Sequence, residues 1–154
     1  MTKEEEIEYL KQRVEFYRRD YLTNLLGKAD FLHDLRTHIK NNKQFWLVMH
    51  DIDGLHAINR EQGYRAGDAV ILEVANELKM CSEPCHVYRI SGDEFMVIYC
   101  NEPVDYELDE TTCAVVNAKE YNHPDELIDA VDKLVIEEKS KLKRRDSDRN
   151  KILR

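Results

Sequence analysis

The stretch FWLVMHDID at positions 45–53 constrains the fold of this chain more than any other. Its apolar, β-rich residues are typical of a strand buried inside a sheet. The stretch ends in Asp51 and Asp53, and an acidic pair at the end of a buried strand is costly unless something positive compensates it. The sequence therefore predicts a central strand with an acidic end.

A second acidic pair lies in a predicted β-hairpin. The strand-like runs HVYRI and EFMVIYC flank a turn that contains Ser91, Gly92 and Asp93, and Glu94 follows directly. If this hairpin lies beside the 45–53 strand, the two acidic pairs come together. Hard oxygen ligands at a sheet edge suit Mg²⁺ or Mn²⁺, which phosphoryl transfer uses to neutralise charge. From spacing alone, a metal site and a group of solvated acids both remain open.

The remaining pattern predicts helices around this sheet. Amphipathic spacing favours helices over 3–19, 28–39, 55–62 and 65–80, and a last helix that opens at His123-Pro124-Asp125. Residues 101–110 are polar and predict a loop, and TTCAVVNAKEY from residue 111 predicts a strand. This order predicts an α/β (α+β) sandwich, with helices packed on a mainly antiparallel sheet.

We divide the chain into an N-terminal helix (1–19), a main domain (20–145) and a basic tail (146–154) that is expected to fray. The N-terminal helix carries an apolar stripe at a/d spacing, made of Ile7, Leu10, Val14, Tyr17 and Tyr21. The stripe is too short to establish a coiled coil, which needs three or four heptads. Two interpretations stay open: the helix docks on its own domain, or it forms a dimer contact.

The charge balance excludes one class of partner. Lys plus Arg number 23 and Asp plus Glu number 31, which gives a net charge of −8 and argues against a protein that binds nucleic acid polymers. No apolar run approaches the roughly 20 residues of a membrane helix, so we expect no membrane partner. The N-terminus lacks the apolar core of a signal peptide. We therefore expect a cytoplasmic protein whose four cysteines are reduced.

Four motifs then appear in order, and together they resemble the GGDEF family, the diguanylate cyclases. They are D-x-LT-x-LL at 20–26, DID at 51–53, N-x3-G-x3-GD at 59–68 and R-x-SGDEF at 89–95. The resemblance covers about residues 16 to 143. It implies a fold like that of nucleotide cyclases and polymerase palms. It also implies a homodimer that condenses two GTP into cyclic di-GMP and pyrophosphate with Mg²⁺ or Mn²⁺.

The resemblance also assigns roles at the acidic pairs. Asp51 matches the first metal-binding aspartate of the family, and the backbone carbonyl of Ile52 completes that side of the metal. Asp93 matches a metal ligand needed for catalysis. Glu94 matches the neighbouring acid at the metal and the reacting 3′-hydroxyl.

Other matched positions would bind the substrate. Asn59 and Asp68 match the pair that recognises guanine, and Gly92 lets the backbone approach the phosphates. Lys139 and Lys143 match the phosphate contacts, although another frame uses Arg145 and Arg149-Asn150. Structural roles remain open too. In the structural alternative, Asn59 is a polar residue near a helix end, Asp68 is a helix N-cap, and Lys139 and Lys143 form a basic helix end.

Several positions depart from the family pattern. Ser91 replaces the first glycine of the signature, and His56 stands where the family usually has lysine. The 101–110 loop stands in place of a helix, and Ser82 and Cys85 replace the Arg and Asp of the product-inhibition motif. We therefore keep two alternatives to a diguanylate cyclase. One is a module that binds GTP or cyclic di-GMP without turnover, and the other is a cyclase that makes a mixed or linear purine dinucleotide.

Overall fold

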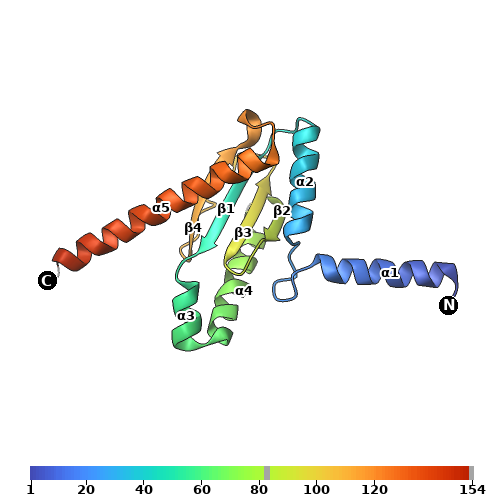
Figure 1. The fold of residues 1–154 in the computed structure, drawn as a ribbon, viewed down its shortest axis with the longest axis horizontal. Coiled ribbons are helices and arrows are strands. Elements are labelled where there is room, and N and C mark those ends of the chain that lie inside the picture. The colour runs from blue at the N-terminus through green and yellow to red at the C-terminus, as the bar shows by residue number, and fades with distance from the viewer. Residues whose placement is uncertain (82–83, 153–154) are drawn as a thin grey trace.

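The computed structural model describes residues 1–81 and 84–152, and the side chains of 84–85 and 145–152 lie outside this description, as does Ser82. Figure 1 shows helices packed on both faces of one sheet. In chain order, the elements are α1 (Lys3–Arg18), α2 (Lys28–Lys40), β1 (Trp46–Ile52), α3 (Leu55–Gln62), α4 (Tyr64–Met80), β2 (Pro84–Arg89), β3 (Glu94–Tyr99), β4 (Thr111–Asn117), the 3₁₀ turn η1 (Ala118–Glu120) and α5 (Pro124–Ile152).

The sheet has four strands in the order β2-β3-β1-β4, and each neighbouring pair is antiparallel. Strand β1 therefore has a partner on both sides. Its side chains alternate between two cores, because successive residues of a strand point to opposite faces. Leu47 and Met49 pack on the face covered by α2 and α5, whereas Val48 and Ile52 pack on the face covered by α4. Both faces of β1 are covered, and this accounts for its continuous apolar run.

Two glycines shape the chain directly after β1. Gly54 has a φ of 68° and Gly63 a φ of 90°, in the left-handed region that favours glycine. Gly54 turns the chain from β1 into α3, and Gly63 lies between α3 and α4. Helix α3 thus extends beyond the end of β1, and α4 runs back beside α3 (Figure 1).

The segment between β3 and β4 is a loop, as predicted. Tyr106 and Leu108 of this loop are partly buried against the core on the α4 side of the sheet. The loop therefore supplies apolar side chains to the core on the α4 side of the sheet, and the domain needs no additional helix there to cover this core.

Helix α1 projects away from the rest of the molecule (Figure 1). None of its residues is buried, and Leu10, Val14 and Tyr17 of the stripe are 51%, 58% and 70% exposed. The helix ends at Arg18, so Tyr21 lies beyond it. The interpretation that this helix docks on its own domain is therefore wrong. Its apolar stripe contacts no core of this chain.

The C-terminal helix is longer than expected. The backbone of α5 is helical to Ile152, past the start of the predicted basic tail at residue 146, and the fraying of this tail stays a prediction. Residues 125–154 contain neither glycine nor proline, and they are rich in lysine, arginine, glutamate and leucine, which favour helix.

The cysteine prediction was wrong in part. Cys81 and Cys113 are free, whereas Cys100 forms a disulfide. The spacing of cysteines in a sequence does not reveal such a bond, since it depends on which Cα atoms the fold brings within reach. Among the described helices, none combines the length and the apolar character needed to cross a bilayer. The cytoplasmic location stays a prediction.

An ion pair ties the segment after α1 to the β2–β3 hairpin. Arg89 donates to both carboxylate oxygens of Asp20 at 3.0 Å, and the two side chains are only 11% and 16% exposed. Thr23 donates to the same carboxylate from its backbone N–H and its hydroxyl, both at 2.8 Å. Burial acts to raise the pKa of Asp20, but the Thr23 hydrogen bonds and the Arg89 guanidinium outweigh it and hold this pKa below its usual value.

We expect Arg89→Met to lower the free energy of unfolding by about 2 kcal/mol at pH 7, because it leaves a half-buried carboxylate without its cation. Because the pKa of Asp20 is lowered, this contribution is present above pH 4 and is lost as the pH falls below it. Urea denaturation at pH 7 and pH 3 measures both effects. Arg18→Met is the matched control: Arg18 pairs with Asp30 but is exposed, and its removal should leave the midpoint nearly unchanged. Equal losses from the two variants contradict the prediction.

Candidate functional site

The end of β1 and the turn of the β2–β3 hairpin meet at one edge of the sheet. Asp51 lies directly opposite Glu94 in the β1–β3 register, and the backbone N–H of Ile52 donates to the carbonyl of Asp93 at 2.8 Å. Carboxylate oxygens of Asp51, Asp93 and Glu94 all lie within 4.8 Å of one another. The three predicted metal ligands are thus brought together by the strand pairing. We call these three residues the carboxylate cluster.

Asp53, the other acid at the end of β1, takes a different position. Its carboxylate accepts a hydrogen bond from the hydroxyl of Thr112 at 2.6 Å, and its backbone N–H donates to the carbonyl of Glu110. Asp53 therefore anchors the start of β4 and is not part of the carboxylate cluster.

The cluster is electrostatically unfavourable when no cation balances it. Burial raises the pKa of Asp51, and the neighbouring Asp93 raises it further, against the lowering effect of Lys139. Burial likewise raises the pKa of Glu94, and the charge of Asp51 adds to that effect. A bound cation relieves such repulsion, and clustered carboxylate oxygens are the ligands that Mg²⁺ and Mn²⁺ prefer. The donor set therefore fits a hard divalent cation.

Lys139 of α5 contacts the cluster directly. Its Nζ donates to Oδ1 of Asp51 at 2.7 Å, and the side chains of Lys139 and Asp51 are 34% and 14% exposed. The matching motif indicated a phosphate contact for Lys139, and it did not indicate this ion pair. Lys143 lies one turn further along α5 and is exposed. The side chains of the alternative frame, Arg145 and Arg149-Asn150, lie outside the described residues.

Asn59 of α3 packs closely against Gly67 of α4. A Cβ atom built on Gly67 lies 1.7 Å from Oδ1 of Asn59 and 2.8 Å from its Cγ, so only glycine leaves room for this amide. Asp68 follows Gly67 and lies within α4, whose N-cap is Gly63; the reading of Asp68 as an N-cap is therefore wrong. The sequence analysis missed this role of Gly67, although Gly67 is the second glycine of the motif N-x3-G-x3-GD at 59–68.

The signature turn is less strained than its sequence indicates. Neither Ser91 nor Gly92 has a positive φ, so Ser91 replaces a glycine without a backbone penalty. A Cβ on Gly92 meets no atom within 4 Å. Gly92 therefore does not adopt a left-handed conformation, and the position is open to solvent or to a ligand.

A second group of acids, made of Glu73, Glu77 and Glu110, lies between α4 and the start of β4. Glu73 is exposed and the other two are partly buried, and no motif of the sequence includes them. We assign this second group no function.

The comparison with protein families decides how the carboxylate cluster is interpreted. The family described as "Diguanylate cyclase, GGDEF domain" matches residues 17–126, which is most of the chain. The chain belongs to the GGDEF family. The match includes β1, the hairpin, Asn59 and Asp68, but it ends near the start of α5 and leaves Lys139 and Lys143 outside it.

The relatives of this chain include a protein named as a diguanylate cyclase. The chain is 35% identical over 80 residues to diguanylate cyclase VdcA of Vibrio cholerae. This alignment covers 51% of this chain and 24% of VdcA. The chain is 34% identical over 96 residues to the uncharacterized membrane protein SSP1970 of Staphylococcus saprophyticus. That alignment covers 59% of this chain and 26% of SSP1970. The chain thus spans about a quarter of the length of these relatives.

The fold is also that of known GGDEF structures. The coiled coil and GGDEF domain of DgcB from Caulobacter crescentus, solved in complex with c-di-GMP, superposes with a TM-score of 0.76 at 19% identity. The superposition covers 89% of this chain and 88% of that one. This likeness confirms the predicted fold class, an antiparallel sheet flanked by helices.

Proposed function

We propose that this chain is a diguanylate cyclase that condenses two GTP into cyclic di-GMP and pyrophosphate as a homodimer. The observation that supports this most strongly is the carboxylate cluster, in which Asp51, Asp93 and Glu94 present their oxygens to one point at the edge of the sheet. The family assignment and the likeness to VdcA support the same reaction class.

In this proposal Asp51, Asp93, Glu94 and the carbonyl of Ile52 hold Mg²⁺ or Mn²⁺. A bound divalent cation neutralises charge on the phosphates and clamps their oxygens. Glu94 lies beside Asp51 and Asp93, at the place where the 3′-hydroxyl would react. Gly92 leaves open space for the phosphates, and Lys139 and Lys143 offer ammonium groups to phosphate oxygens.

Asn59 and Asp68 recognise the base in this proposal. An amide offers both a donor and an acceptor, and a carboxylate accepts from guanine N1–H and N2–H. The close packing of Asn59 on Gly67 fixes the amide beside the α4 residue that carries the carboxylate. The pair therefore favours guanine over adenine, which lacks both of those N–H groups.

Two subunits are required because one GTP site cannot close a ring of two nucleotides. We propose that the exposed stripe of α1 pairs with that of a second copy. The stripe contacts no core of its own chain, and the DgcB structure that resembles this chain includes a coiled coil. Pairing holds two catalytic domains in reach of each other, so that each 3′-hydroxyl attacks the other α-phosphate.

We expect Val14→Asp to weaken dimer formation at least about tenfold, since burial of a valine contributes about 1.5 kcal/mol or more and the variant places a charge in the seam. Sedimentation equilibrium over a range of protein concentrations measures this. Phe16→Asp is the control, because Phe16 is also an exposed apolar residue of α1 but lies outside the stripe; it is 73% exposed, against 58% for Val14. Unchanged association of Val14→Asp contradicts the role of α1 and leaves the cyclase activity to be judged separately.

The proposed function is tested by incubating the protein with GTP and Mg²⁺ and identifying the products by mass. Cyclic di-GMP supports the cyclase. Binding of GTP or cyclic di-GMP in a calorimeter without any product supports the module that binds without turnover. A reaction with both ATP and GTP tests for a mixed dinucleotide, and the product mass separates cyclic from linear forms.

A further inference from the structure

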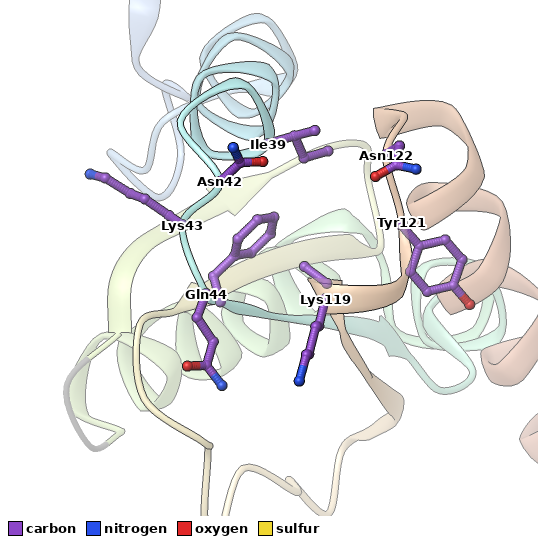
Figure 2. Close-up of a pocket in the computed structure, with 9 residues that line it drawn as sticks. Ile39, Asn42, Lys43, Gln44, Lys119, Tyr121 and Asn122 are labelled. Atoms are coloured by element: carbon purple, nitrogen blue, oxygen red, sulfur yellow. The ribbon is translucent and has the colours of Figure 1, made fainter.

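A pocket lies at the opposite end of β1 from the carboxylate cluster. Figure 2 shows it where the end of α2 leads into β1 and where β4 leads through η1 towards α5. Its volume is about 340 Å³. Phe45 at its base and Asp51 in the cluster are about 20 Å apart along the strand, at about 3.3 Å per residue. The pocket is therefore separate from the proposed GTP site.

The base of the pocket is apolar and preformed. Phe45 and Ala118 are 1% and 5% exposed, and Ile39 packs against the same core. The backbone N–H of Ala118 donates to the carbonyl of Phe45 at 3.0 Å, which joins the two segments that form the base. The carbonyls of residues 37–39, at the end of α2, all accept hydrogen bonds from the backbone N–H groups of residues 41–43. The backbone around the base is thus already satisfied.

The rim of the pocket carries polar side chains that lack partners. Within the described part of the chain, the side chains of Asn42, Gln44, Lys119 and Asn122 form no hydrogen bond or ion pair, and no acidic residue lines the pocket. Figure 2 shows Gln44 and Lys119 extending in the same direction, whereas the amine of Lys43 points away from both. In a chain with a net charge of −8, the rim of this pocket is cationic.

We propose that this pocket binds a small organic anion: a ring or short apolar body that carries one carboxylate or phosphate group. The apolar body would lie against the partly buried Ile39, above the buried Phe45 and Ala118. The anionic group would receive hydrogen bonds from the ammonium of Lys119 and the amide of Gln44, since hydrogen bonds to charged groups are the strong ones. The volume lies within the usual range of small-molecule sites, about 300–1,000 Å³. This inference does not depend on cyclase activity.

The test is an NMR titration of the ¹⁵N-labelled full chain with three probes of similar size. Phenyl phosphate and benzoate carry the two candidate anions, and benzylamine carries the opposite charge. We expect saturable shifts at the backbone amides of Gln44, Lys119 and Tyr121 with at least one anion, and weaker or no shifts there with benzylamine. The anion with the lower dissociation constant identifies which group the pocket prefers.

Two lysine variants sharpen the test. Both lysines line the pocket, but only Lys119 extends with Gln44, so Lys119→Ala should weaken anion binding at least tenfold and Lys43→Ala no more than twofold. Unchanged spectra elsewhere in the chain establish that both variants fold. The proposal is overturned by any of three results: no saturable shift at the pocket with either anion, equal binding of benzylamine, or equal losses from the two variants.

Discussion

Replacing Asp93 with asparagine should lower the turnover of GTP at least about 10³-fold. The change keeps the size of the side chain but removes one of three negative charges from the carboxylate cluster. Charge neutralisation by a bound metal contributes several kcal/mol to phosphoryl transfer, and each 1.36 kcal/mol is a factor of ten in rate. The variant should remain folded, because it removes a carboxylate that repels Asp51 and Glu94.

The control removes a charge from the second group of acids. Glu73→Gln makes the same change in charge in the group formed by Glu73, Glu77 and Glu110. Steady-state rates of pyrophosphate release measure both variants, and thermal unfolding establishes that they fold. We expect Glu73→Gln to retain the rate of the wild-type chain within a factor of two or three. If Asp93→Asn retains it as well, the carboxylate cluster is not the catalytic site.

Replacing Gly67 with alanine should produce the second large effect, a loss of GTP affinity of at least about tenfold. The new Cβ occupies the space of the Asn59 amide, at 1.7 Å from its Oδ1, so Asn59 has to leave its position. A Gly→Ala change inside a helix otherwise stabilises it by up to about 1 kcal/mol. Any loss of stability or affinity is therefore attributable to the displaced side chain. Calorimetric titration with GTP measures the affinity, and urea denaturation measures the stability.

A double-mutant cycle separates the displacement of Asn59 from a general defect. In a chain that already carries Asn59→Ala, the clash is absent, and the added Gly67→Ala change should be neutral or stabilising. Gly27→Ala is the control for a glycine that has room for a Cβ atom, because a Cβ on Gly27 would lie 3.6 Å from its nearest neighbouring atom. If Gly67→Ala lowers affinity equally with and without Asn59, then Gly67 acts through another contact.

The sequence predicted the carboxylate cluster because its parts depend on local pattern and strand pairing. The apolar run before Asp51 marks a buried strand, and the turn at Asp93 and Glu94 marks a hairpin. Only one further step is needed, that the hairpin pairs with the strand, and the register places Glu94 opposite Asp51. Helices α1 to α4 were likewise predicted to within a few residues, since the spacing of their apolar residues is a local property of the sequence.

Other parts of the site depend on how distant elements cross. The ion pair of Lys139 with Asp51 requires α5 to pass over the end of β1, and no spacing along the chain encodes that crossing. The contact of Asn59 with Gly67 depends on how closely α3 and α4 approach each other. Asp53 resembles Asp51 in sequence, but Thr112 binds it only because β4 pairs with β1 in the observed register.

The central claim, that the carboxylate cluster turns over GTP, is tested most directly by the mass of the nucleotide product. The wild-type chain is incubated with saturating GTP and Mg²⁺ over a range of protein concentrations. We predict cyclic di-GMP, formed at a rate per chain that rises with protein concentration until the dimer saturates, and no product without the divalent cation. GTP recovered unchanged at every protein concentration, with no heat of GTP binding, would contradict both the cyclase and the GTP site.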